Sequence, residues 1–179
     1  MEEGLLFLEP GCGRGEHLRF FQQLGLDVYG ADLSPEAPFL AKDLAINVCN
    51  LELDGLPYPD NYFDVIYSKS FLEHLKNPED FFKEAYRVLQ LGSTLLIEVP
   101  DAENYAKLPV GSAFWLGIRE HIYHFSAQAL ISALKRHGFS IISVRRAILP
   151  TPEFDYPSLM ILAEKGSASN SLSVPLESN

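Results

Sequence analysis

Three alternate glycines and an acid two residues before the first are the residues of this chain whose spacing could do chemistry. Gly11, Gly13 and Gly15 follow the apolar run 5–8 and Glu9, and a pattern with helical spacing begins directly after them. Glycine permits positive φ and close approach of a ligand to the backbone, and N–H groups at the start of a helix can face that ligand. A phosphate here would be repelled by the nearby carboxylate. The segment therefore predicts a binding loop for a ligand that carries an ammonium, a sulfonium or ribose hydroxyls.

A second acid, Asp32, ends the next strand that the pattern predicts, residues 26–33. In a βαβ unit, a carboxylate at the carboxyl end of the second strand accepts hydrogen bonds from a ribose diol. The alternative is an aspartate that caps the following turn, since Ser34 and Pro35 begin a helix-start pattern. Asp32 by itself does not tell one adenosine-containing cofactor from another.

Residues 9–15 resemble motif I of the class I S-adenosylmethionine-dependent methyltransferases, acid-x-G-x-G-x-G, at every defined position. Residues 51–67 resemble the family's link between the third and fourth strands, which forms its adenine pocket. Residues 84–100 resemble the helix and strand that follow. The resemblance spans about residues 5–165 and is to the small-molecule methyltransferase-domain branch, type 11/23-like. The acid and the close glycine spacing favour S-adenosylmethionine over NAD as the cofactor, and a nicotinamide dehydrogenase is the disfavoured alternative.

The resemblance implies an α/β fold with a Rossmann-like, seven-stranded, mostly parallel sheet, helices on both faces and an antiparallel last strand between the fifth and the sixth. The pattern of the chain predicts helices at about 14–24, 36–42, 78–89 and 127–137, and strands at about 5–9, 26–33, 45–50, 63–68, 93–100, 139–148 and 159–164. Residues 1–165 are expected to form one methyltransferase domain from which the family's N-terminal helices are missing. The Ser-rich segment 166–179 is expected to be a disordered tail.

The resemblance also implies which residues hold S-adenosylmethionine and release S-adenosylhomocysteine. The glycine loop passes under the methionine part, Glu9 orders that loop or meets the ammonium group, Asp32 holds the ribose diol, and Asn50 and Leu51 frame adenine. We expect Glu9 and Asp32 to face one shared cavity. The full predicted set is Glu9, Gly11, Cys12, Gly13, Gly15, Asp32, Leu33, Asn50, Leu51 and Ser68.

Two histidines are the candidate catalytic residues. His74 follows Glu73 after the fourth predicted strand, and an imidazole that titrates near neutrality can accept a hydroxyl proton. In the related ubiquinone-biosynthesis O-methyltransferases this pair joins an acid four residues before the histidine to hold a divalent metal. Ser70 stands at that place here, so no metal is predicted. The alternative is that Glu73 and His74 only fix the loop; His121 is the second candidate and faces either the acceptor or the core.

Residues 101–125 form the one long stretch without a clear period, and they are rich in aromatic and titratable side chains. Long irregular segments of compact domains are commonly binding loops or lids. We therefore expect this segment to line the acceptor site, with an ordinary covering loop as the alternative.

Composition narrows the classes of partner. A chain of 179 residues with 47% hydrophobic residues suffices for one domain. The formal charge of −10 disfavours duplex nucleic acid as a partner. Cys12 and Cys49 are the only cysteines and are expected to be free thiols in a reducing compartment. No stretch has the length of a membrane span or the pattern of a signal peptide, so a cytoplasmic location is expected.

The sequence therefore predicts an enzyme that moves a methyl group from S-adenosylmethionine to a small-molecule acceptor, at an O, N or C atom that the sequence does not name. The rival interpretation is a non-catalytic methyltransferase-like binding module or subunit. It is favoured by the missing N-terminal helices and by Ser70 and Asn50, which depart from the family pattern.

Overall fold

The structure is a computed structural model that describes residues 4–150 and 155–166. The strands of this part of the chain are β1 (Leu6–Pro10), β2 (Asp27–Asp32), β3 (Ala45–Val48), β4 (Phe63–Lys69), β5 (Leu89–Pro100), β6 (Phe139–Pro150) and β7 (Asp155–Lys165). The α-helices are α1 (Glu16–Gln23), α2 (Ala37–Leu40), α3 (Leu51–Asp54), α4 (Pro78–Val88), α5 (Gly111–Leu116) and α6 (Ala127–Arg136), and two 3₁₀-helices are η1 (Leu72–His74) and η2 (Ala102–Lys107). The predicted tail lies outside the described residues, apart from Gly166.

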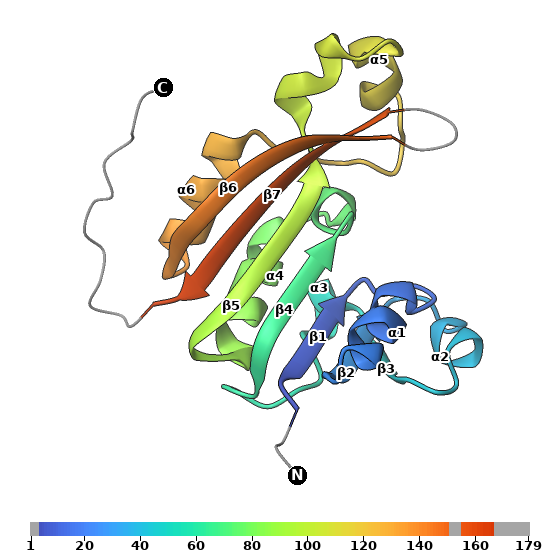
Figure 1. Ribbon diagram of the computed structural model, residues 1–179, viewed down its shortest axis with the longest axis vertical. Helices are drawn as coiled ribbons and strands as arrows, with labels where there is room; N and C mark the ends of the chain where they lie inside the picture. Colours follow the sequence, from blue (N-terminus) through green and yellow to red (C-terminus); the bar gives the residue numbers. More distant parts are fainter. Residues whose placement is uncertain (1–3, 151–154, 167–179) are drawn as a thin grey trace.

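The strands form a single sheet in the order β3-β2-β1-β4-β5-β7-β6 (Figure 1). All neighbouring pairs from β3 to β5 are parallel, whereas β7 pairs antiparallel with both β5 and β6. The predicted fold, including the place of the last strand, is confirmed. Since the parallel strands share one direction, their carboxyl ends meet along one edge of the sheet, where α/β proteins bind ligands.

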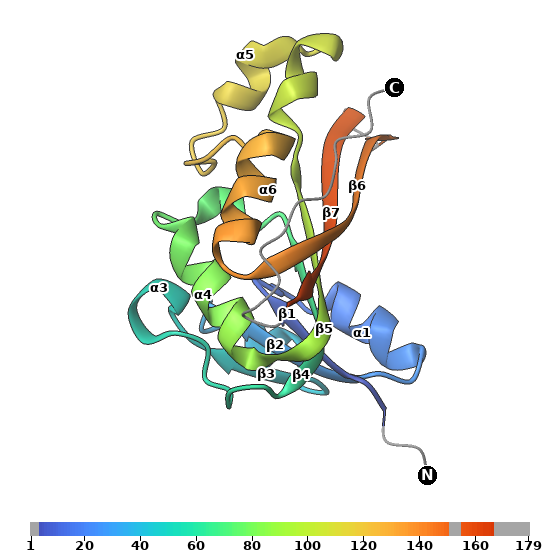
Figure 2. The ribbon, with the colours of Figure 1, turned by 90° about the vertical axis from the view of Figure 1, so that its left-hand side faces the viewer.

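Helices cover both faces of the sheet, with α1 on one side and α4 and α6 on the other (Figure 2). Successive side chains of β1 point to opposite faces: Phe7 packs in the α1 cluster with Leu18 and Tyr67, and Leu8 packs in the larger cluster with Phe81 of α4. Helix α1 ends where Gly25 adopts a φ of 88°, which glycine reaches without strain.

The start of β5 differs from the sequence expectation. The strand was predicted from residue 93 and the preceding helix to about residue 89, but the strand begins at Leu89. Leu89 is fully buried and pairs with Phe63 of β4. Local pattern favoured a helix end here, and the pairing with a strand more than twenty residues away decided otherwise.

The segment 101–125 is more ordered than its lack of period suggested. It contains η2 and α5, which lie beyond the carboxyl end of β5 (Figure 1). Tyr105, Leu108 and Trp115 form a small separate core with Tyr156 of β7 packed against it, and the Tyr105 and Trp115 rings stack with centroids 5.5 Å apart. Two short helices thus use aromatic packing to hold this segment against the sheet.

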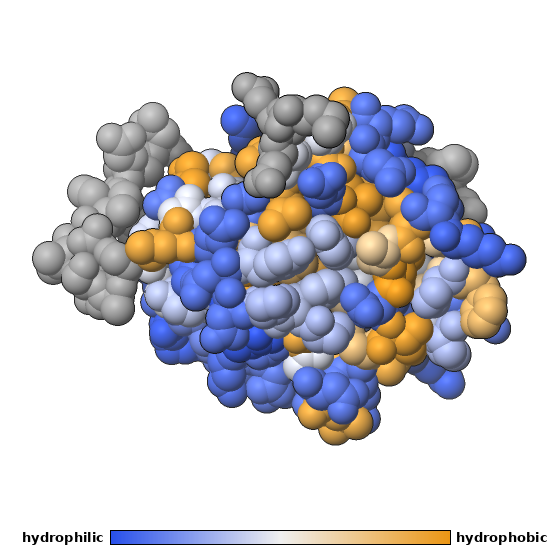
Figure 3. All heavy atoms as spheres, turned by 90° about the horizontal axis from the view of Figure 1, so that it is seen from below, coloured by the Kyte–Doolittle hydropathy of each residue, from blue (hydrophilic) through white to orange (hydrophobic). Residues whose placement is uncertain are grey.

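On the face seen in Figure 3, hydrophobic side chains occur in several groups between hydrophilic ones. Scattered exposed apolar residues such as Leu5, Phe20 and Leu24 are ordinary for folded proteins. Among the described residues, no helix has both the length and the apolar character needed to span a bilayer.

Candidate functional site

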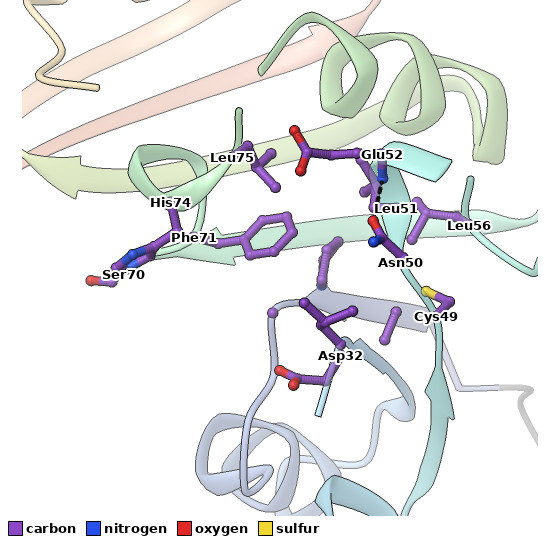
Figure 4. Close-up of a pocket in the computed structure, with 14 residues that line it drawn as sticks. Asp32, Cys49, Asn50, Leu51, Glu52, Leu56, Ser70, Phe71, His74 and Leu75 are labelled. Atoms are coloured by element: carbon purple, nitrogen blue, oxygen red, sulfur yellow. Dashed lines mark hydrogen bonds between the residues drawn. The ribbon is translucent and has the colours of Figure 1, made fainter. Parts of the chain in front are cut away.

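A cavity of about 330 Å³ opens at the carboxyl edge of the sheet, between the ends of β1 and β2 on one side and α3 and η1 on the other. In Figure 4 the Phe71 ring extends from the η1 end of the cavity towards Leu51 and Asn50. The lining residues are Pro10, Gly11, Ala31, Asp32, Leu33, Cys49, Asn50, Leu51, Glu52, Leu56, Ser70, Phe71, His74 and Leu75.

The glycine loop fits tightly under this cavity. Gly11 has a φ of 74°, and a Cβ built there would lie 2.3 Å from Cδ2 of Phe71. Because L side chains rarely adopt this φ and the Phe71 ring occupies the space, a larger residue would displace either the loop or the ring. Gly11 thus lets the Phe71 ring and the backbone come together at the cavity wall.

The backbone N–H groups of this loop are used within the chain. Those of Gly11 and Cys12 donate to the Ala31 carbonyl at 2.7 and 3.4 Å, that of Gly15 donates to the Cys12 carbonyl at 2.8 Å, and that of Gly13 donates to the Asp32 carboxylate at 2.8 Å. A loop that cradles pyrophosphate offers such donors to the ligand instead. This arrangement therefore fits a cofactor without phosphate groups better than a dinucleotide.

Asp32 ends β2 at the cavity. Its Oδ2 accepts the Gly13 N–H and its Oδ1 accepts the Ser34 N–H, both at 2.8 Å. A carboxylate has about four lone-pair sites, so each oxygen keeps acceptor capacity on its other side. Asp32 therefore fixes the following turn, as the capping alternative expected, and it also lines the cavity.

Asn50 and Leu51 line the cavity at the start of α3. The Asn50 side chain caps this helix, because its Oδ1 accepts the Glu52 N–H at 3.1 Å. Its amide group and the second lone pair of Oδ1 are left for other partners. Leu51 is buried at 7% exposure and contributes apolar surface. Together these two residues can pair with a polar edge and pack against a flat ring.

The link between α3 and β4 is held by α4. Arg87 donates to the Leu56 and Tyr58 carbonyls at 2.8 Å each and pairs with Glu84 at 2.7 Å. The Glu84 carboxylate in turn accepts the Leu56 N–H at 2.7 Å. Hydrogen bonding with Arg87 lowers the pKa of Glu84, so the carboxylate that holds the Leu56 backbone is charged at neutral pH. Leu56 is thereby fixed at the cavity wall.

Glu73, His74 and His121 meet beside the cavity. The backbone carbonyl of Glu73 accepts the N–H groups of Ile122 at 2.7 Å and Tyr123 at 3.1 Å, which holds the segment after α5 against η1. Nδ1 of His74 donates to the Glu120 carbonyl at 2.9 Å, so Nε2 carries the free lone pair. The rings of His74 and His121 have centroids 5.0 Å apart. Burial lowers the pKa of His121 and raises that of Glu73 to about 7.

The chain matches the protein-family model described as "Methyltransferase domain" over residues 2–144. The chain belongs to this family. It is 30% identical over 146 residues to an uncharacterized protein of Methanocaldococcus jannaschii, covering 79% of this chain and 67% of that one. It is also 33% identical over 104 residues to phosphoethanolamine N-methyltransferase 3 of Arabidopsis thaliana, covering 54% of this chain. The chain spans 21% of the length of that plant enzyme.

The fold of the methyltransferase domain agrees with solved structures. An S-adenosylmethionine-dependent methyltransferase from Methanosarcina mazei superposes with a TM-score of 0.78 at 22% identity, over 93% of this chain and 94% of the other. The resemblance to the class I S-adenosylmethionine-dependent methyltransferases is therefore confirmed. S-adenosylmethionine is the cofactor of this family.

The structure places half of the predicted cofactor-binding residues of this methyltransferase domain at the cavity. Gly11, Asp32, Leu33, Asn50 and Leu51 line it. The other five lie outside its lining: Glu9, Cys12, Gly13, Gly15 and Ser68. Of these, Gly13 reaches the site through its bond to Asp32.

We expected Glu9 and Asp32 to face one cavity, but Glu9 does not line the cavity that Asp32 lines. It is 2% exposed on the α1 side of the sheet, and its Oε1 lies 2.8 Å from Nδ1 of His17 in α1. Burial raises the pKa of Glu9, with a smaller opposing contribution from His17. The hydrogen bond that His17 donates to Glu9 raises the pKa of His17. The reason for the difference is the alternation of β1, which directs Phe7 and Glu9 to the α1 face.

Cys12 and Ser68 are buried behind the loop. Cys12 is 5% exposed, and a Cβ on Gly30 would lie 2.6 Å from its sulfur, so Cys12 fills a narrow slot that takes only a small side chain. Burial, with the charges of Asp32 and Glu9, raises its pKa to about 12, which keeps the thiol protonated and unreactive. Ser68 is fully buried in β4, and no described residue hydrogen-bonds its hydroxyl.

Sequence reasoning missed Phe71, Cys49 and Leu75 as lining residues. Phe71 follows a strand end by two residues, and no local pattern separates it from an ordinary core residue. Conversely, none of the described residues 101–125 lines this cavity. His121 of that segment reaches it only through contact with His74.

Proposed function

We propose that the chain transfers a methyl group from S-adenosylmethionine to a small-molecule acceptor. The observation that carries this proposal is the cavity at the carboxyl ends of β1 and β2, which combines the Gly11 backbone, the Asp32 carboxylate and the Asn50–Leu51 wall with His74. The internally bonded glycine loop supports a cofactor without phosphate. A small acceptor is supported by the family to which the chain belongs and by its partial similarity to an enzyme named for phosphoethanolamine.

The cofactor residues have the chemistry that this ligand needs. The Asp32 carboxylate accepts the hydrogen bonds of the ribose diol. Asn50 pairs with the edge of adenine, and Leu51 packs against its face. The closely packed loop of Gly11, Cys12, Gly13 and Gly15 passes under the methionine part, with Glu9 supporting the loop from behind and Ser68 behind the cavity wall.

The bound cofactor supplies a methyl group on a sulfonium that is already a good leaving group. The protein's main task is therefore to hold the acceptor atom in line with that methyl group, and such positioning contributes roughly 7–11 kcal/mol to lowering the barrier. Where the acceptor carries a proton, Nε2 of His74 accepts it, because Nδ1 is fixed as a donor to Glu120 at 2.9 Å. His121 supports the His74 ring from the segment after α5.

Ligand binding tests the cofactor assignment. The chain should melt at a higher temperature with S-adenosylmethionine or S-adenosylhomocysteine and should not respond to NADH, because a bound ligand stabilises the folded state by mass action. No shift with either sulfur ligand at millimolar concentration would contradict the proposal. That result would favour the non-catalytic binding module instead.

A methyl-transfer assay tests catalysis. Tritiated S-adenosylmethionine is offered with a panel of small acceptors that bear hydroxyl, amine or phosphoethanolamine groups, and label transfer identifies the atom methylated. Replacing His74 with glutamine should lower turnover of a protonated acceptor by about 10²–10⁴-fold while cofactor binding stays near that of the wild type. His137→Gln, at the end of α6, is the control, and equal activity of the two variants would refute the base role.

We also propose where the protein acts and which class of acceptor it avoids. We place the protein in the cytoplasm, supported by the free thiols Cys12 and Cys49, since disulfides are rare in reducing compartments. The charge of −10 supports an acceptor other than duplex nucleic acid.

A further inference from the structure

Three side chains of metal-ligand type converge at the wall of the cavity. Ligand atoms of Glu73, His74 and His121 all lie within 4.8 Å of one another. Glu73 and His74 belong to η1, whereas His121 comes from the segment after α5, which the chain reaches more than forty residues later. The fold, and not local sequence, therefore brings these ligands together.

The Glu73 carboxylate is buried without a hydrogen bond from the described part of the chain. It is 1% exposed, and no described residue hydrogen-bonds either of its oxygens. Nδ1 of His121 is likewise buried and has no hydrogen-bond partner in the described part of the chain. Buried polar groups in native proteins are almost always paired, and a buried carboxylate needs a positive partner or a metal. The cluster therefore has ligand atoms on Glu73 and His121 that are left without hydrogen bonds.

The geometry around these ligands is fixed by the backbone. His74 donates from Nδ1 to the Glu120 carbonyl at 2.9 Å, and its Nε2 lies 4.0 Å from Oε1 of Glu73. Metal-binding histidines commonly donate their other ring N–H to a carbonyl or carboxylate, which orients the ring. The two bonds from Ile122 and Tyr123 to the Glu73 carbonyl fix His121 beside the pair.

We infer that Glu73, His74 and His121 bind a divalent cation of the zinc and cobalt class. Two imidazoles and one carboxylate are a ligand set that suits such ions, whereas magnesium and calcium prefer oxygen ligands throughout. Tetrahedral ligands at about 2.0–2.2 Å from a zinc ion lie about 3.3–3.6 Å apart. The 4.0 Å between Nε2 of His74 and Oε1 of Glu73, and the limit of 4.8 Å within the cluster, therefore shorten by about 0.5–1.5 Å when a zinc ion is bound.

This ligand set differs from the one that the sequence could suggest. Ser70, at the place of an acid in the related ubiquinone-biosynthesis enzymes, hydrogen-bonds the Tyr156 hydroxyl at 3.0 Å instead. His121 supplies the third ligand from a different segment. Three protein ligands leave one position of a tetrahedral ion open. Of the three, His74 also lines the cavity, so the site adjoins it.

The open position gives the site a role that rests on the proposed methyl transfer. A divalent ion lowers the pKa of a hydroxyl that binds it. An oxygen acceptor in the cavity would then lose its proton to solvent before attack on the methyl carbon. The lone pair of His74 serves as a ligand in this metal-bound form and as the base in the metal-free chain.

Cobalt binding tests the site without an activity readout. The untagged full chain is stripped with a chelator and titrated with Co²⁺, followed by visible absorption and calorimetry, and Zn²⁺ is then added to displace the cobalt. We expect one Co²⁺ per chain and an absorption band typical of tetrahedral cobalt. Glu73→Gln and His121→Ala should each lower the affinity for Co²⁺ by about tenfold or more. His137→Ala keeps all three ligands and should bind as the wild type.

Circular dichroism confirms that each variant is folded, and His121→Gln replaces His121→Ala if that variant is not. Cobalt binding that is absent in the wild type, or unchanged in the Glu73 and His121 variants, would overturn the inference. Melting shifts with S-adenosylhomocysteine are measured on the same stripped samples. A raised melting temperature with S-adenosylhomocysteine but no cobalt binding would refute only the metal site. Cobalt binding with an unchanged melting temperature would refute only the proposed function.

Discussion

Replacing Asp32 with alanine removes the carboxylate that the cavity presents at the end of β2. Its two oxygens accept the N–H groups of Gly13 and Ser34, both at 2.8 Å. Each oxygen keeps a further lone pair, and these are the proposed acceptors for the ribose diol. The variant therefore loses both a direct contact to the cofactor and one fixed point of the glycine loop.

The size of the effect follows from the kind of bond that is lost. A hydrogen bond to a charged group contributes about 1.5–3 kcal/mol, and each 1.4 kcal/mol corresponds to a tenfold change in affinity. We expect Asp32→Ala to weaken binding of S-adenosylhomocysteine by about 10- to 150-fold. Asp32→Asn keeps the shape and one carbonyl acceptor, so its loss should fall near the lower end of that range.

Isothermal titration calorimetry with S-adenosylhomocysteine measures the affinity of each variant. Asp27→Ala removes an exposed carboxylate from the opposite end of the same strand and should bind as the wild type. Melting curves without ligand separate a loss of fold from a loss of contact. A folded Asp32→Ala variant whose Kd stays within about twofold of the wild type would refute the ribose assignment.

Two further predictions concern the loop and its support. Gly11→Ala should destabilise the fold by about 1–3 kcal/mol more than Gly13→Ala, because the new Cβ at position 11 meets the Phe71 ring at 2.3 Å while position 13 faces open space; equal urea midpoints would contradict this. Glu9 and His17 both have raised pKa values in the folded protein, so each binds its proton more tightly there than in the unfolded chain. The stabilisation that these protons provide is lost as pH rises through the folded-state pKa values. Between about pH 6 and pH 9 the wild type should therefore lose more stability than Glu9→Gln, as measured by urea unfolding at both pH values, and parallel losses would count against the pair.

The amino-acid sequence determined the elements whose signals are local. The apolar run, the alternate glycines and the helical spacing after them specified β1, the loop and α1, because periodicity and backbone freedom act over a few residues. Gly25 and Gly138 follow the ends of α1 and α6, and both have a φ of 88°, which glycine reaches without strain. The family pattern added the order of the strands, including the antiparallel β7.

Only the tertiary structure decided which side chains meet. Strand alternation sent Glu9 to His17 on the α1 face and left Asp32 alone among the predicted acids at the cavity. Phe71 became a cavity wall because it packs over Gly11. His121 reached Glu73 because two backbone hydrogen bonds join segments that lie far apart in the chain. Contacts of this kind depend on the register and packing of distant elements, which local periodicity does not encode.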